Sequence, residues 1–191
     1  MKHYDFKDGL DFNDFFYCYS PQARCCGEFI READCIKSRY NDEVGDYEYT
    51  TIMLRERLRS GNKVTAVCDF ERRGAPLIII SDTLYEKDGH TYYGDHFEAV
   101  AFEEGCNVWH NTLPTDPNYP KALVTDKIHF EDIPTPNKSR VTLSVTFGDG
   151  RLDIEMNGKS FTVYNDELPG EFYLGITGCE GINRFYSFTV E

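Results

Sequence analysis

The sequence predicts an all-β protein, built as a two-sheet antiparallel β-sandwich. Apolar and polar residues alternate in a series of short runs, which is typical of strands that bury one face. Turn residues separate these runs, and evidence for helices is weak. Many short strands without helices between them indicate a sandwich or a barrel.

The predicted strands follow one another through the last two thirds of the chain. They span residues 64–70, 75–81, 97–102, 106–110, 140–147, 151–156, 161–164, 172–177 and 185–190. Residues 48–54 fit a strand as well as the start of a helix. Before them, aromatic clusters without clean alternation predict only short strands and loops.

Turn signals mark the ends of several of these runs. Glycine occurs in the segments 72–74, 104–105, 148–150, 157–158 and 169–170. Asn157-Gly158 is the strongest signal, because both central residues of a type I′ hairpin turn need positive φ.

Length and charge limit the classes of function. The chain has 191 residues, with 33 acidic against 20 basic side chains and a formal net charge of −13. No stretch resembles a linker, so we expect one domain over residues 1–191, which buries about 70% of its unfolded surface. The negative charge disfavours nucleic acids and anionic membranes as partners and favours a neutral ligand.

The cysteines predict a reducing compartment. There are seven, an odd number, and Cys25 and Cys26 are adjacent. No apolar signal sequence follows Met1 and no segment is long enough to span a bilayer, so we expect a cytoplasmic protein with reduced thiols. The C-x-x-C spacing of a zinc site is absent. Cys68 alternates with apolar residues and is expected to be a small buried side chain.

One predicted hairpin carries most of the functional information. Residues 96–102 and 106–111 flank residues 104–105, which can form a two-residue turn. Such a turn places Val100 opposite Trp109. Residues directly opposite one another share a face of the sheet, so the turn determines what each face carries.

The two faces of this hairpin differ in character. One face is small and apolar, and consists of Phe97, Ala99, Ala101, Cys106 and Val108. The other mixes aromatic rings with carboxylate and amide groups, and consists of His96, Glu98, Val100, Phe102, Asn107, Trp109 and Asn111.

A sugar is recognised by such a mixture. Its C–H faces stack on aromatic rings, while its hydroxyls need hydrogen-bond donors and acceptors. The candidate ligand-binding residues are Glu98, Asn107, Trp109 and Asn111, with His96 and Tyr93 near the rim. The structural alternative is that Trp109 only covers this face and its polar neighbours are solvated.

Other polar residues are weaker candidates. Asp69, Glu71 and Asp82 close two predicted strands, where paired carboxylates can bind calcium or act as acid and base. Turn acids of this kind are also commonly solvated, and we assign no metal and no cofactor to them. His110 ends the apolar face and is expected to be a hydrogen-bonded residue at the edge of the core.

Three stretches resemble the concanavalin A-like superfamily of jelly rolls. Residues 150–158 are similar to its G-x-L-x-V-x-V-N-G hairpin, which also occurs in laminin-G-type domains. Residues 172–178 and 184–188 resemble its paired closing strands. Residues 97–100 resemble the central strand that lines the concave face in sugar-processing members.

This resemblance implies two curved sheets with carbohydrate binding or hydrolysis on the concave one. The E-x-D-x-x-E signature of family-sixteen glucanases is absent, because residues 95–100 place a single carboxylate, Glu98, on the relevant face. Retaining hydrolysis requires two carboxyl groups about 5 Å apart. The expected function is therefore lectin-like binding of a neutral mono- or oligosaccharide.

Two other functions are compatible with the same residues. The first is a glycoside hydrolase, lyase or sugar isomerase, in which Glu98 transfers protons together with His96 or His110. The second is a protein-interaction domain, in which the aromatic face forms a homodimer interface.

Overall fold

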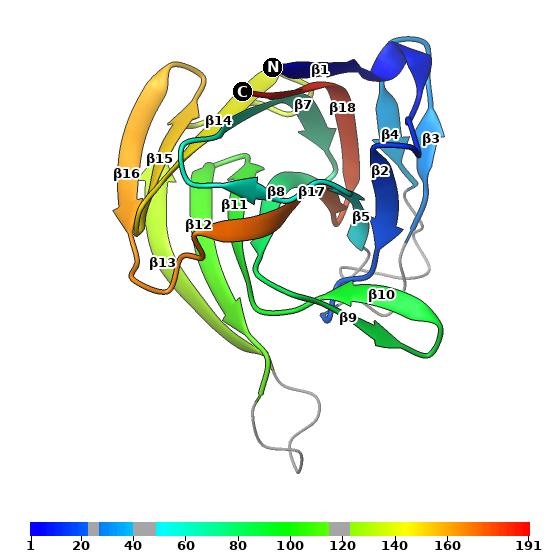
Figure 1. Ribbon diagram of the computed structural model, residues 1–191. Coiled ribbons are helices and arrows are strands. Elements are labelled where there is room, and N and C mark those ends of the chain that lie inside the picture. Colours follow the sequence, from blue (N-terminus) through cyan, green and yellow to red (C-terminus); the bar gives the residue numbers. More distant parts are fainter. Residues whose placement is uncertain (23–26, 40–48, 115–122) are drawn as a thin grey trace.

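The computed structural model describes residues 1–22, 27–39, 49–114 and 123–191 (Figure 1). In these residues two large antiparallel sheets pack face to face, which confirms the predicted all-β sandwich. The one helical element among them is a short 3₁₀ turn, η1 (Phe6–Asp8).

Sheet A forms one layer of the sandwich. Its strands are β1 (Lys2–Asp5), β3 (Phe29–Arg31), β4 (Ile36–Ser38), β7 (Lys63–Glu71), β14 (Val141–Gly148), β15 (Arg151–Met156), β16 (Lys159–Tyr164) and β18 (Ile182–Val190). Their order is β16-β15-β14-β7-β18-β4-β3, and β1 pairs with β18. The two ends of the chain therefore lie on adjacent strands (Figure 1).

Sheet B forms the other layer. Its strands are β2 (Phe15–Cys18), β5 (Tyr49–Leu54), β6 (Leu58–Arg59), β8 (Ala75–Ser81), β11 (His96–Phe102), β12 (Gly105–Thr112), β13 (Val124–Asp132) and β17 (Glu171–Cys179). Their order is β13-β12-β11-β8-β17-β5-β2, and β6 pairs with β17. A separate hairpin, β9 (Leu84–Lys87) with β10 (His90–Tyr93), extends from this sheet (Figure 1).

Every strand predicted in the last two thirds of the chain is present, and residues 49–54 form a strand rather than a helix. Two of the predicted turns have the expected conformation. Asn157 and Gly158 have φ of 52° and 82°, as a type I′ turn requires, and Gly150 has φ of 64°. Gly170 has no positive φ. A further type I′ turn, which was not predicted, joins β9 to β10 at Asp88 and Gly89, with φ of 52° and 76°.

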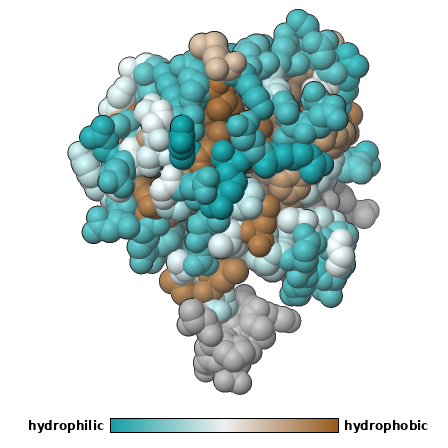
Figure 2. Space-filling view, viewed as in Figure 1, coloured by the Kyte–Doolittle hydropathy of each residue, from teal (hydrophilic) through white to brown (hydrophobic). Residues whose placement is uncertain are grey.

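The main core lies between the two sheets. On β15, Leu152, Ile154 and Met156 point inward while the alternate residues face solvent. Sheet B contributes Ile78 and Ile80 of β8 in the same way. Each such side chain, when fully buried, contributes about 1.5–3 kcal/mol to folding. The face seen in Figure 2 is correspondingly mostly hydrophilic, with apolar residues reaching the surface in narrower areas.

A second apolar cluster lies on the outer face of sheet B. It consists of Cys18, Met53, Leu77, Ile79, Tyr93, Val100 and Cys179. The 19–22 segment and β10 contribute to covering it, since Tyr19 pairs with Tyr92 in a parallel bridge. Sheet B therefore buries part of both faces, unlike a sheet with one solvated side.

Cys68 is buried in the main core, as predicted. The described cysteines, Cys18, Cys35, Cys68, Cys106 and Cys179, are all buried, and no two of them are joined by a disulfide. The adjacent cysteines Cys25 and Cys26 lie outside the described residues. No helix in the described parts of the chain is long and apolar enough to cross a membrane.

Candidate functional site: a groove on sheet B

Polar and aromatic residues lie in register across the outer face of sheet B. Strand pairing places Glu98 of β11 between Ile79 of β8 and Trp109 of β12. Trp109 pairs in turn with Lys127 of β13. This row therefore brings a carboxylate, an indole and an ammonium to the same face.

The next row on this face lies two residues further along β11 and β12. It places Val100 opposite Asn107, and Asn107 opposite Phe130. The β12–β13 register shifts between Val108 and Trp109. As a result Lys127 and Phe130, three residues apart on β13, lie on the same face, and the Lys127 ammonium contacts the rings of both Trp109 and Phe130. Such a shift is the mark of a β-bulge.

The predicted faces of the β11–β12 hairpin are confirmed, but its register is wrong. Trp109 lies opposite Glu98 and not opposite Val100, because the turn is formed by Glu103-Glu104. The register moves by two residues, which leaves every side chain on its predicted face. Gly105 belongs to β12, where an added Cβ would lie 2.1 Å from the Glu131 carbonyl oxygen of β13. Glycine at this position therefore allows β12 and β13 to approach closely.

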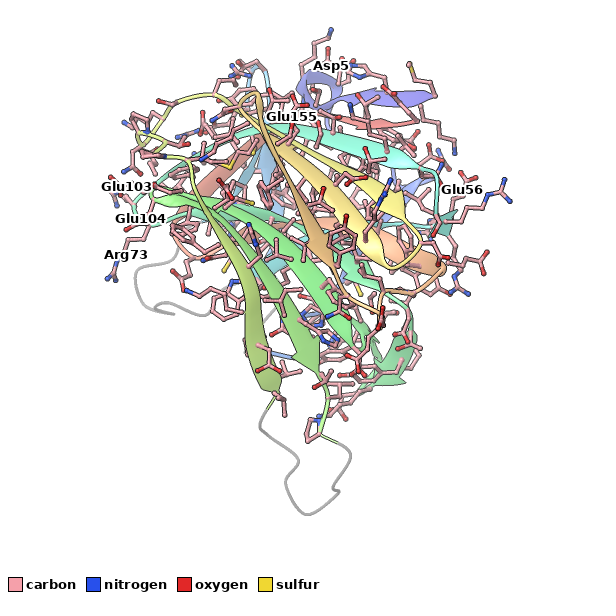
Figure 3. The ribbon with its side chains drawn as sticks, turned by 90° about the vertical axis from the view of Figure 1, so that its left-hand side faces the viewer. Asp5, Glu56, Arg73, Glu103, Glu104 and Glu155 are labelled. Atoms are coloured by element: carbon pink, nitrogen blue, oxygen red, sulfur yellow. The ribbon has the colours of Figure 1, made fainter. Side chains whose placement is uncertain are left out.

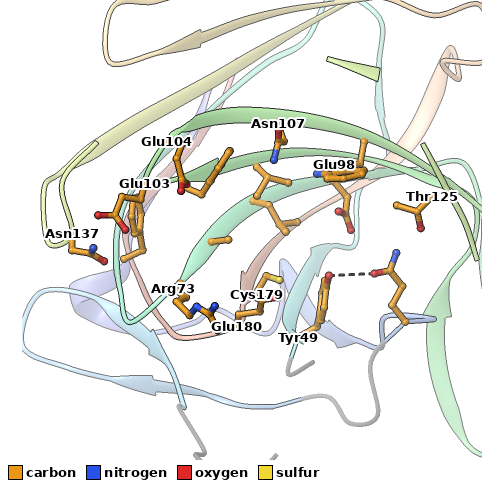
Figure 4. Close-up of a pocket in the computed structure, with 18 residues that line it drawn as sticks. Tyr49, Arg73, Glu98, Glu103, Glu104, Asn107, Thr125, Asn137, Cys179 and Glu180 are labelled. Atoms are coloured by element: carbon orange, nitrogen blue, oxygen red, sulfur yellow. Dashed lines mark hydrogen bonds between the residues drawn. The ribbon is translucent and has the colours of Figure 1, made fainter. Parts of the chain in front are cut away.

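These rows line one side of a groove with a volume of about 470 Å³ (Figure 4). Glu98, Thr125 and Tyr49 lie toward one end and Glu103 and Glu104 toward the other. Figure 3 shows that Arg73, Glu103 and Glu104 project from the same end of the molecule. Further residues of the lining are Gln22, Phe70, Gly74, Ala75, Leu77, Val100, Phe102, Asn107, Trp109, Asn137, Cys179 and Glu180.

His96 contacts the carboxylate of Glu98 and positions it. Nε2 of His96 lies 3.2 Å from Oε1 of Glu98, and the two side chains are 0% and 6% exposed. Nδ1 of His96 lies 2.8 Å from the carbonyl oxygen of Gly94. Because that carbonyl can only accept, Nδ1 must donate, and the tautomer of the imidazole is fixed.

Tyr49, Tyr93 and Cys179 surround the carboxylate of Glu98. Burial raises the pKa of both phenols well above the ordinary value, and the negative charge of Glu98 raises it further. Burial and Glu98 also raise the pKa of the Cys179 thiol. These three groups therefore stay protonated at neutral pH, and Tyr49 donates to Oε1 of Gln22 at 3.2 Å.

Trp109 is partly exposed beside the groove, and Lys127 approaches its face. The Nζ of Lys127 lies 5.6 Å from the centre of the indole ring and 5.9 Å from that of Phe130. Phe102 lies next to Phe130, with ring centres 6.1 Å apart. Aromatic side chains and the Lys127 ammonium therefore lie along the β12–β13 side of the groove.

Two of the predicted site residues are buried and do not lie at a rim. Tyr93 is 0% and His96 is 1% exposed, because β10 lies over this part of sheet B. The Tyr93 and His96 rings make an edge contact at 4.7 Å. The backbone N–H of Tyr93 donates to the Tyr19 carbonyl, which fixes β10 to the N-terminal segment.

The two predicted asparagines differ in access. Asn107 is partly exposed and lines the groove, and its Oδ1 is buried without a hydrogen-bond partner in the described structure. Asn111 is fully buried and accepts a hydrogen bond from Nε2 of Gln22 at 3.2 Å. Gln22 and Tyr49 were missed, because only the three-dimensional fold brings them to this hairpin.

His110 lies on the opposite face, at the edge of the core, as predicted. Its ring stacks on Phe97 at 4.2 Å, and its Nδ1 lies 3.2 Å from Oε2 of Glu167. The hypothesis that His110 is a proton-transfer partner of Glu98 is therefore wrong, since the sheet separates the two side chains. The histidine that contacts Glu98 is His96.

The strand-end acids have structural partners. Asp69 and Glu71 bind the guanidinium of Arg184 at 3.0 and 2.6 Å on sheet A. Asp82 directly follows the end of β8, a strand of the other sheet. In the part of the chain that the structure describes, no three His, Cys, Asp or Glu side chains are grouped to hold a metal ion.

The chain matches no protein-family model and no curated protein sequence. Among solved structures it is similar to the carbohydrate-binding module CBM66 from Bacillus subtilis, with a TM-score of 0.63 and 12% identity over 91% of this chain and 99% of the other. It is similar to a glycoside hydrolase family 16 endo-glucanase from Bacteroides ovatus, with a TM-score of 0.67 and 10% identity over 100% and 99%. It is also similar to β-agarase A from Zobellia galactanivorans, with a TM-score of 0.69 and 9% identity over 93% of this chain and 82% of the other.

The fold is a concanavalin A-like jelly roll. The predicted resemblance is thereby confirmed at the level of the fold. The same jelly roll supports a binding module and hydrolases, so the chemistry must be argued from the groove.

The groove of this jelly roll offers one carboxylate at its buried end. The residues of β11 that line the groove include Glu98, Val100 and Phe102, so the strand presents a single acid on this face. Glu103 and Glu104 lie toward the other end of the groove (Figure 4). The arrangement can accept hydrogen bonds from hydroxyls at Glu98 and stack a ring on Trp109, and β11 carries no second carboxylate on this face to act with Glu98.

Proposed function

We propose that this protein binds a neutral glycan in the groove of sheet B without cleaving it. The observation that carries the proposal is the row in which Trp109 lies directly beside Glu98. The partly exposed indole offers an apolar surface to the C–H face of a sugar. The carboxylate beside it accepts hydrogen bonds from hydroxyls, which are stronger when the acceptor is charged.

The remaining polar groups suit a polyhydroxylated ligand. Asn107 contributes an amide with an unpartnered oxygen, and Gln22 and Thr125 contribute further donors and acceptors to the lining. The similarity to CBM66, named as a carbohydrate-binding module, supports the proposal.

The charge of the groove favours neutral over anionic sugars. Its lining includes the carboxylates of Glu98, Glu103, Glu104 and Glu180 against the guanidinium of Arg73. The whole chain carries a net charge of −13. The negative charge of a sulfated or uronic-acid sugar would be repelled by these carboxylates, which disfavours its binding.

A glycan array followed by titration calorimetry tests this proposal. The array should contain neutral, sulfated and uronic-acid oligosaccharides, and we expect binding to neutral members only. Trp109→Ala should lower the affinity about tenfold or more, which is about 1.4 kcal/mol. Tyr164→Ala is the matched control, because Tyr164 is an exposed aromatic residue on sheet A and its removal should leave binding unchanged.

Absence of binding to any neutral glycan at millimolar concentration would refute the proposal. Equal affinities of Trp109→Ala and the unaltered protein would refute the assignment of the site. Circular dichroism of each variant must show that the sandwich is retained.

A further inference from the structure

The two halves of the outer face of sheet B differ in access. In the row of Ser81, His96 and Asn111, every side chain is at most 1% exposed. Phe102 and Asn107, toward the β11–β12 turn, are partly exposed and line the groove. A ligand can therefore reach one half of this face and not the other.

Two segments cover the closed half. One is β10, whose Tyr93 packs its ring against His96. The other is the chain that continues from β2 through Ser20, which is itself 1% exposed, to Gln22. The backbone of Tyr19 bonds to both Thr91 and Tyr93, so the two segments form a continuous cover.

Gln22 closes the boundary between the two halves. Its Nε2 donates to Oδ1 of Asn111 on β12, and its Oε1 accepts from the hydroxyl of Tyr49 on β5 (Figure 4). Three strands separate β5 from β12, so the two strands are about 19 Å apart along the sheet. Gln22 joins the side chains of these two strands, and the three joined side chains form a bar across the face.

We propose that the groove receives the end of a glycan chain, and that Gln22 is the residue that excludes a continuing chain. This inference rests on the proposed function. A protein that binds the interior of a polysaccharide needs a groove through which the chain can leave at both ends. Here the bar of Tyr49, Gln22 and Asn111 stops the groove at its buried end. The volume of about 470 Å³ leaves room for about two sugar rings.

The structure also indicates which end of the groove is open. Arg73, Glu103, Glu104 and Asn137 lie at the exposed end, opposite Glu98 (Figure 4). The terminal sugar would lie over Glu98 and Trp109, and the rest of the chain would leave past these residues. Affinity should then depend on the terminal one or two sugars and little on those that follow.

Calorimetry with linear and cyclic oligosaccharides tests this inference. The probes are β-linked glucose and galactose oligosaccharides of increasing length, together with cyclic β-glucans, which have no chain end. For the linear series that binds, we expect affinity to stop rising after about two units, and we expect no binding of the ring. Gln22→Ala removes this side chain from the closed end and should raise the number of units over which affinity rises. Tyr164→Ala, on sheet A outside the groove, should leave the dependence on length unchanged.

A ring bound as tightly as the linear chain would overturn the inference, as would an affinity that keeps rising with every added unit. In either case glycan binding itself, and so the proposed function, would stand. If neither the linear nor the cyclic probes nor any neutral array glycan binds the folded protein, the proposed function fails and the inference fails with it.

Discussion

Nε2 of His96 lies 3.2 Å from Oε1 of Glu98, and both side chains are buried beneath the groove. Nδ1 of His96 also donates to the carbonyl of Gly94, which fixes the orientation of the imidazole. The two residues therefore act as one positioned unit at the floor of the groove. The acid available to a ligand is a carboxylate positioned by its histidine.

Substitution of His96 should lower the free energy of unfolding more than substitution of Glu98. His96→Phe leaves the Glu98 carboxylate buried without a partner and should lower the free energy of unfolding by about 3 kcal/mol or more. Glu98→Gln keeps a hydrogen bond, because the new amide can donate to Nε2, and should cost about 1 kcal/mol. Urea denaturation monitored by circular dichroism measures both. Equal losses would contradict the pairing.

The ion pair of Glu71 with Arg184 should contribute to stability at neutral pH and not in acid. The hydrogen bond from Arg184 lowers the pKa of Glu71, with Lys138 adding to the effect. A carboxylate whose pKa is lower in the folded state stabilises the protein above its ordinary pKa, and this contribution is lost as pH falls through the folded value. Glu71→Gln should cost about 1 kcal/mol at pH 7 and nearly nothing at pH 2 to 3. A pH-independent loss would argue for a purely steric role.

The described cysteines should resist alkylation in the folded protein. Burial raises the pKa of the Cys106 and Cys35 thiols to about 12, and burial likewise raises that of Cys68 and Cys179. At pH 8 only about one Cys106 thiol in ten thousand is then ionised. Iodoacetamide followed by peptide mass spectrometry should find these residues modified only in urea. Rapid native labelling of Cys106 would mean that the β11–β12 edge opens readily.

Lys127 should compete with a ligand for the face of Trp109. An exposed cation–π contact contributes about 0.5–1 kcal/mol, and a sugar stacked on the indole must displace the ammonium. Lys127→Met should therefore tighten glycan binding about two- to fivefold. Weaker binding in this variant would show instead that the ammonium contacts the ligand.

The sequence predicted the fold and the two faces of the central hairpin well, because alternation on β11 and β12 is regular. It missed β13, since the register shift beside Trp109 breaks the period of two and polar residues occupy both faces of this edge strand. The hairpin register was wrong because Gly105 resembles a turn residue but is needed for close packing against Glu131.

The closed half of the groove could not be predicted from alternation. Gln22 meets Tyr49 and Asn111 only through contacts between residues 27 and 89 positions apart. Tyr93 was expected at the rim because it was read as part of a loop beside the central hairpin, yet it belongs to β10 and is buried. The Asp88-Gly89 turn that makes this possible was visible in the sequence.

Trp109 is the only tryptophan in the chain, so its indole reports directly on the groove. The most direct measurement is the position of its single indole N–H signal by nuclear magnetic resonance while a neutral oligosaccharide identified on the array is added. Binding over Glu98 and Trp109 predicts a saturable shift of this signal, with the same dissociation constant as calorimetry gives. Calorimetric binding that leaves the indole signal unmoved would place the glycan elsewhere and contradict the proposed site.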